Sequence, residues 1–217
     1  MINRSSARQL QYVVYAVALV ITLACLMMTT LMREGLPVDG STVLSRMIFI
    51  DQNTALWSAS WCVWMFAAIG LYLFCAVFAS QLNPSVFRTV GLALVGMGIP
   101  ADLSAEVIYA FIIPKQIALD AGPDLIIFLE QLASHLTGFL GNGLYNLGGL
   151  MLTLLAFSQK KLPVWLFAPG ILAWLLGLAL SASIAVDAMK AAEIFTALSM
   201  TLSTLWMVVW AKTRLAD

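Results

Sequence analysis

The chain has 217 residues, of which 62% are hydrophobic and 10% are charged, and its mean hydropathy is +0.95. A soluble domain has roughly 45–50% apolar and about 25% charged residues, so this composition excludes a soluble globular protein and a disordered chain. The 11 basic and 11 acidic residues cancel, which leaves no net charge to attract a nucleic acid. We therefore expect a polytopic membrane protein without a nucleic-acid partner.

Six apolar stretches are long enough to cross a membrane as helices, because about 20 apolar residues span a hydrocarbon core of about 30 Å. Glycine, proline and asparagine residues separate the stretches and support their boundaries independently of hydropathy. The first stretch is too long for the apolar core of a signal peptide and is expected to be retained. We predict an all-α, six-helix transmembrane bundle in one domain, 1–217, with helices at about 12–32, 55–80, 87–114, 125–157, 164–186 and 194–212.

The basic residues favour an orientation with both termini in the cytoplasm, since cytoplasmic loops carry an excess of Lys and Arg. Most of the basic residues are then inside. The acidic residues are almost all on the other side: only Asp217 is cytoplasmic, whereas Asp39 and the rest fall in the outer half or the outer loops. We expect a multi-pass protein of the plasma (inner) membrane. The basic residues predicted inside are Arg4, Arg8, Arg88, Lys160, Lys161, Lys212 and Arg214.

The third predicted helix carries two carboxylates inside the membrane, Asp102 and Glu106. Each ionised acid at a helix centre costs about 2.5–3.5 kcal/mol even on a lenient insertion scale, so two in one span need compensation. Glu106 lies one turn outward of Asp102 on the same face, and Tyr109 shares that face. These residues predict an anionic site slightly outward of the bilayer midplane.

The fourth predicted helix presents a polar stripe. At about 100° per residue, His135, Gly138, Asn142 and Asn146 fall within about 80° of one another. Helices three and four are consecutive and antiparallel, so we place Asp102 at the level of Asn142. We also predict a contact between Glu106 and His135, which would form a protonatable pair. The stretch 125–157 is too long for one upright span, so its outer end should tilt, break or lie in the interface.

Tryptophans line one face of the second predicted helix. Tryptophans near the end of a span are usually interface anchors, and Trp57 fits that role. Trp61 and Trp64 lie deeper and could contact a ligand. The segment 41–53, which precedes this helix, is expected to lie along the outer interface.

The sequence contains no motif that indicates a metal site or a cofactor-binding site. One histidine and three isolated cysteines do not make a zinc site, and we predict no metal and no cofactor. The sequence contains no phosphate loop, dinucleotide fingerprint or nucleophile elbow.

The polar residues are therefore interpreted as a site for binding or transport of a small cationic or proton-coupled solute. Carboxylates beside aromatic faces suit an organic cation, and transporters place polar groups near the midplane on glycine-rich or broken helices. The predicted ligand-binding residues are Asp102, Glu106, His135, Asn142, Asn146, Trp61, Trp64 and Tyr109.

Two other functions fit the same residues. In the first, the protein is a structural subunit of a larger membrane complex, and the polar groups serve only to hold its helices together. Alternatively, Asp102, Glu106 and His135 could divide acid and base roles in an intramembrane enzyme that acts on a lipid-soluble substrate. Expected partners are membrane lipids, the small ligand, and a second copy or a partner membrane subunit, since six helices often need a second copy to enclose a pathway.

Overall fold

The computed structural model describes residues 4–38 and 40–215, with side chains from residue 7 onward. Within these ranges six helices are long and apolar enough to span a membrane, which confirms the predicted number of spans. Asp39 and Asp217, together with the side chain of Arg4, belong to the predicted charge distribution but lie outside the described part of the chain.

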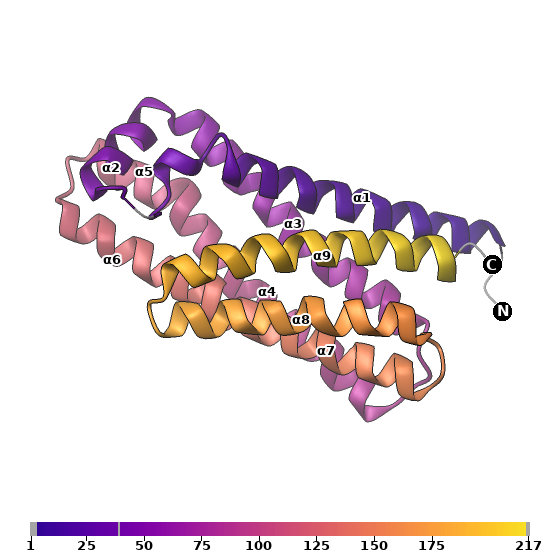
Figure 1. Ribbon diagram of the computed structural model, residues 1–217. Coiled ribbons are helices and arrows are strands. Elements are labelled where there is room, and N and C mark those ends of the chain that lie inside the picture. Colours follow the sequence, from indigo (N-terminus) through magenta and orange to yellow (C-terminus); the bar gives the residue numbers. More distant parts are fainter. Residues whose placement is uncertain (1–3, 39, 216–217) are drawn as a thin grey trace.

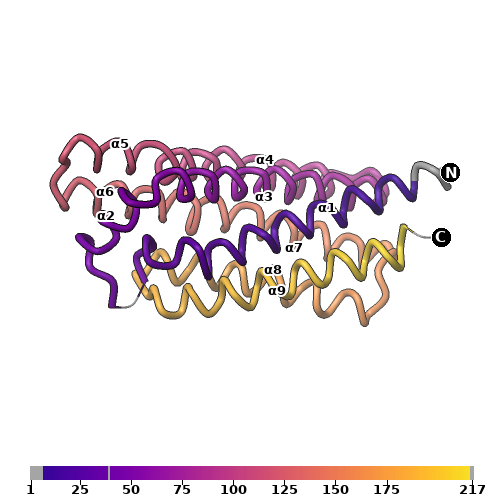
Figure 2. Tube along the Cα trace, turned by 90° about the horizontal axis from the view of Figure 1, so that it is seen from above, coloured from indigo at the N-terminus to yellow at the C-terminus, as the bar shows by residue number. Residues whose placement is uncertain are grey.

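The spans form one elongated bundle in which the described chain begins and ends at the same end, called here the terminal end (Figures 1 and 2). Two of the spans are composite, because a π-helical turn joins consecutive helices without a break in the rod. The single-helix spans are α1 (Arg4–Thr29), α3 (Thr54–Ser80), α8 (Val164–Ala185) and α9 (Met189–Arg214). The composite spans are α4 (Val86–Val107), η2 (Ile108–Ile112) and α5 (Ile113–Ala118), then α6 (Pro123–Ser134), η3 (His135–Gly141) and α7 (Asn142–Ser158).

The prediction that the third span ends at Pro114 is wrong. Pro114 lies in the first turn of α5, a position that tolerates proline, and the helix continues to Ala118. The π-helical turn η2 directly precedes the proline. In it the N–H of Ile113 donates to the carbonyl oxygen of Ile108, five residues back, so the chain stays helical up to Pro114.

The segment 41–53 lies at the end of the bundle opposite the terminal end and contains a short helix, α2 (Val43–Gln52). Thr42 and Ser45 start it with a reciprocal capping box. α2 contacts α5 and α6, and all three lie beyond the turn that joins α8 to α9 (Figure 2). We call this the α2 end.

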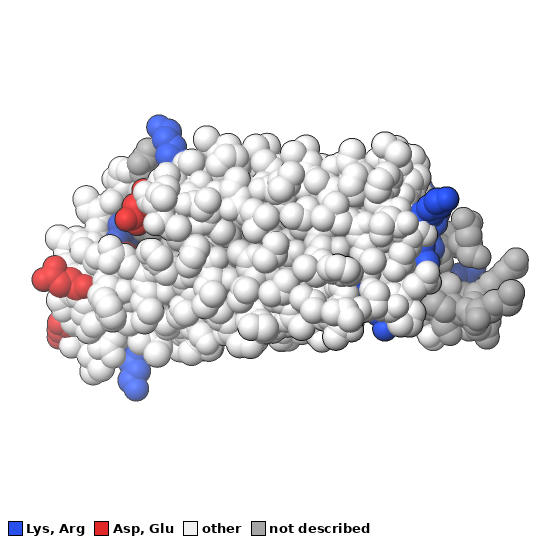
Figure 3. Space-filling view, turned by 90° about the horizontal axis from the view of Figure 1, so that it is seen from below, with Lys and Arg blue, Asp and Glu red and all other residues white. Residues whose placement is uncertain are grey.

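Charged side chains gather at the two ends and leave a wide uncharged band between them (Figure 3). The terminal end of the face shown carries only basic side chains, whereas the α2 end carries both signs. This is the distribution expected when the central band lies in lipid. Described acids near the α2 end are Glu34, Asp51, Asp120, Asp124, Asp187 and Glu193.

Glycines let α4 and α7 pack backbone against backbone. A Cβ atom placed on Gly98 would lie 2.7 Å from the carbonyl oxygen of Gly141, and one on Gly91 would lie 3.2 Å from that of Gly148. Both spans therefore repeat a glycine every seven residues on the facing side, at Gly91 and Gly98 in one and at Gly141 and Gly148 in the other. Small residues at such crossings are typical of membrane helix pairs.

Gly148→Ala is expected to lower the free energy of unfolding by about 1–3 kcal/mol, the usual cost of overpacking. Its methyl group would overlap the carbonyl oxygen of Gly91 and lie 2.9 Å from the backbone nitrogen of Val95, neither of which can rotate away. Gly143→Ala is the matched control on the same helix, because its nearest neighbour would be Ser181 Oγ at 3.8 Å. Equal unfolding midpoints of the two variants in detergent would contradict the prediction.

Candidate functional site

A narrow cavity of about 40 Å³ lies at the centre of the bundle, and all six spans contribute to its walls. It lies near the middle of α1, α3, α8 and α9, where Ile21, Trp64, Trp174 and Met200 line it. The polar lining consists of Asp102, Asn142, Asn146, Ser199 and Ser203, and the aromatic lining of Trp64, Tyr145 and Trp174. Four of the eight predicted site residues, Asp102, Asn142, Asn146 and Trp64, thus meet at one place.

Asp102 is the only carboxylate in this lining, and its side chain is 6% exposed. Its Oδ1 accepts a hydrogen bond from the hydroxyl of Thr137 on η3. Gly141 makes room for it, since a Cβ there would lie 3.4 Å from the Cβ of Asp102. No ion pair within residues 4–38 and 40–215 involves Asp102, so any negative charge on it has no cationic partner in the described chain.

Asn142 lines the cavity together with Asp102, in agreement with the predicted level, but the hydrogen-bond partner of Asp102 is Thr137, which sequence reasoning missed. In an α-helix, residues 137 and 142 would be about 140° apart. The wide turn of η3 (His135–Gly141) bonds residues five apart and brings them to nearly the same side. Periodicity at 3.6 residues per turn cannot anticipate such a turn.

The predicted contact between Glu106 and His135 is wrong. His135 is exposed on the outside of the bundle, and its Nδ1 donates to the carbonyl oxygen of Gln131 at 2.9 Å. Glu106 is 1% exposed, and its Oε2 has no hydrogen-bond partner in the described chain. It lies one turn outward of Asp102 and outside the cavity lining. The π turn that brings Thr137 inward begins at His135, which breaks the predicted stripe.

A glycine on a neighbouring helix makes room for Asn146, which in turn is hydrogen-bonded to Asn142. Asn146 Nδ2 donates to the carbonyl oxygen of Asn142 at 2.8 Å and to its Oδ1 at 3.0 Å. A Cβ on Gly177 of α8 would overlap the Asn146 amide, so only glycine admits this side chain. The amide groups are therefore fixed beside the cavity rather than free to rotate.

Trp61 and Tyr109 form an aromatic cluster outward of the cavity. Their rings stack in parallel with centroids 4.3 Å apart, and the indole nitrogen of Trp61 has no described partner. Trp57 belongs to the same cluster and is 1% exposed, so its predicted role as an interface anchor is wrong. α2 and the α5–α6 extension place this end of α3 inside protein instead of lipid headgroups.

Side chains of α3 also provide hydrogen bonds to backbone carbonyls just before Pro114. Because Pro114 has no N–H, the carbonyls of the preceding turn lack helical donors. Trp57 Nε1 donates to the carbonyl oxygen of Tyr109 at 2.7 Å, and Ser58 Oγ to that of Ala110 at 2.6 Å. Side chains of α3 therefore replace the two hydrogen-bond donors that the π turn and the proline remove from the third span.

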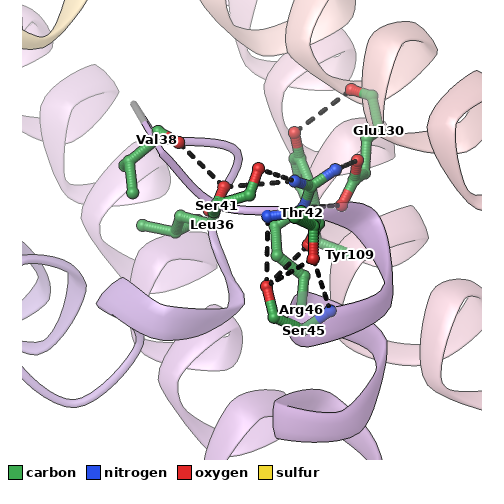
Figure 4. Close-up of polar contacts among 8 residues, drawn as sticks. All are labelled: Leu36, Val38, Ser41, Thr42, Ser45, Arg46, Tyr109 and Glu130. Atoms are coloured by element: carbon green, nitrogen blue, oxygen red, sulfur yellow. Dashed lines mark hydrogen bonds and ion pairs between the residues drawn. The ribbon is translucent and has the colours of Figure 1, made fainter.

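A buried ion pair between Arg46 and Glu130 ties α2 to α6 (Figure 4). Arg46 Nε and Nη2 donate to the two carboxylate oxygens of Glu130 at 2.8 and 2.6 Å, and Nη1 donates to Ser41 Oγ at 3.1 Å. The hydroxyl of Tyr109 donates to the carbonyl oxygen of Glu130 at 3.2 Å. Sequence reasoning missed this pair, because 84 residues separate its members and no local pattern connects them.

No protein-family model, curated protein sequence or solved structure matches the chain. The six apolar spans and the uncharged band define an integral, multi-pass, all-helical membrane protein. Beyond this class, its function has to be argued from the central cavity.

Proposed function

We propose that the central cavity binds a proton or a small inorganic cation, as one step in moving it across the membrane. The observation that carries this proposal is the buried carboxylate of Asp102, which lines a cavity shared by all six spans and has no ion-pair partner in the described chain. A carboxylate in this setting needs a proton or a cation to offset its desolvation.

The size of the cavity favours a small guest. About 40 Å³ accommodates a few water molecules, whereas an engineered protein cavity that binds benzene has a volume of about 150 Å³. An organic cation with an aromatic or branched body does not fit this conformation. The organic solute considered from sequence is therefore replaced by a proton or a monovalent ion.

The lining supports cation chemistry. Two amide groups and two hydroxyls accompany the carboxylate, and oxygen ligands are those that hard cations prefer. Two π-helical turns, η2 and η3, lie on the same two spans as Asp102 and its partner Thr137. Such turns occur frequently at functional sites, and irregular helices near the midplane are a common feature of transporter sites.

The structural-subunit alternative is favoured by one contact, the hydrogen bond from Thr137 to Asp102, which links α4 to η3. The enzyme alternative loses its geometric basis, since His135 is exposed and does not converge on either carboxylate. We also propose that the terminal end faces the cytoplasm of a plasma (inner) membrane, because the described part of that end carries basic side chains and the acids lie opposite.

Purified protein in vesicles with an internal pH dye and an imposed negative-inside potential tests the proposal. We expect faster acidification than in empty vesicles, or uptake of Na⁺ in a parallel assay with a sodium dye. Calorimetry should detect binding of a proton or of Li⁺, Na⁺ or K⁺, but not of tetraethylammonium. Absence of both flux and binding would support the structural alternative, and tetraethylammonium binding would contradict the size argument.

A further inference from the structure

A groove on the outside of the bundle runs along the half of α7 nearest the terminal end. It encloses about 390 Å³, nearly ten times the volume of the central cavity. Six residues of α7 at helical spacings of three and four form its floor, and Phe87 of α4 forms a wall. The floor residues are Leu147, Leu150, Met151, Leu154, Leu155 and Ser158. We propose that this groove binds one acyl chain of an anionic phospholipid whose headgroup lies at the terminal end.

The groove has the length and position of a chain in one leaflet. Leu147 and Ser158 are 11 residues apart, which corresponds to about 17 Å of helix, and one leaflet of hydrocarbon is about 15 Å thick. Ser158 is the last residue of α7. The other end of the groove lies near Gly149, which packs against Trp174 in the middle of α8. The groove thus runs from the headgroup level to about the bilayer midplane.

The side chains that line the groove suit a flexible chain better than a second helix. Helices associate in membranes through small residues, because lipid is as apolar as leucine and burial alone gives no driving force. Here the lining residues are large, apart from Ser158, and leave a hollow. The small residues of α7 are already used, Gly148 against α4 and Gly149 against α8.

The charges at the terminal end select an anionic headgroup. Lys160 is exposed two residues beyond Ser158, and Arg88 directly follows Phe87. Lys161 is close by, although its ammonium group already donates to the carbonyl oxygen of Gln81 at 2.5 Å. Within residues 4–38 and 40–215 the acids lie at the α2 end or inside the bundle, so nothing described here repels a phosphate. Basic residues beside grooves between transmembrane helices are typical of anionic-lipid sites.

Native mass spectrometry of detergent-solubilised protein tests the proposal, with phosphatidylglycerol and phosphatidylcholine of identical chains as probes. We expect the wild type to retain phosphatidylglycerol preferentially. Lys160→Gln should weaken its binding roughly fivefold, the effect of one cation near an anionic headgroup. Met151→Trp should remove the bound lipid by filling the groove. Leu172→Trp is the matched control, since Leu172 is exposed to lipid on α8 outside the groove.

Three results would overturn the proposal. Equal retention of both lipids would show that charge does not select the occupant. Retention of phosphatidylglycerol by Met151→Trp would place the acyl chain elsewhere. A dimer that disappears in Met151→Trp would identify a second copy as the occupant. None of these readouts depends on ion flux, so the experiment tests the lipid site independently of the proposed function.

Discussion

The Asp102→Asn variant is expected to lose cation-dependent flux down to the level of empty vesicles. Asparagine has nearly the shape of aspartate, and its amide oxygen can still accept the hydrogen bond from Thr137, so the contact between α4 and η3 is preserved. Only the negative charge disappears from the cavity. We expect cation affinity to fall by roughly two orders of magnitude (about 3 kcal/mol), the upper range for interactions with a charged group.

Wild-type protein should also bind the inorganic cation more weakly as pH falls, since proton and cation compete for one carboxylate. That pH dependence should vanish in Asp102→Asn and be measurable by calorimetry. Asp51→Asn is the control, because Asp51 is exposed on α2 and far from the cavity lining. Full flux in Asp102→Asn would remove Asp102 from the mechanism. If Asp102→Asn and Thr137→Val both fail to accumulate in the membrane, the structural interpretation is favoured.

The Arg46→Ala variant is expected to detach α2 from α6. Removing the guanidinium leaves the Glu130 carboxylate, 7% exposed, without its two charge-assisted hydrogen bonds. Breaking a buried ion pair from one side costs about 3–5 kcal/mol. Because α2 is a short helix at one end of the bundle, we expect local opening rather than global unfolding, detected as faster hydrogen exchange across 43–52.

The double variant Arg46→Met with Glu130→Leu should restore most of the protection, since replacing both charges by apolar groups leaves no buried charge unpaired. Arg33→Ala serves as the control, because Arg33 is exposed at the same end. Unchanged hydrogen exchange in Arg46→Ala would mean that apolar packing alone holds α2 in place.

The spans and the polar residues were predictable from sequence, because lipid imposes a length on every helix and a penalty on every charge. Asp102, Asn142, Asn146 and Trp64 stand out against an apolar background, and these four meet at the cavity. Hydropathy locates such residues without any knowledge of how the helices pack.

Their partners depend on rotation and register. Thr137 and Asn142 are five residues apart, and only the wide turn of η3 places both on the side of Asp102, while His135 stays on the surface. Ser199 and Ser203 have no distinguishing feature in the sequence of the last span, and only the packing of α9 places them in the lining of the cavity with Asp102. A side-chain direction calculated at 3.6 residues per turn is wrong beyond any π-helical turn, because that turn contains one more residue than an α-helical turn.

By itself, the sequence determined the membrane class, the six spans and the presence of two carboxylates inside the third span, since each follows from the transfer of side chains between water and lipid. Only the tertiary structure decided which of these residues share a cavity. It also decided that Arg46 and Glu130, 84 residues apart, neutralise each other, and that Asp102 has no such partner in the described chain. These are contacts between helices, which depend on where glycines allow close approach and where π turns shift the register.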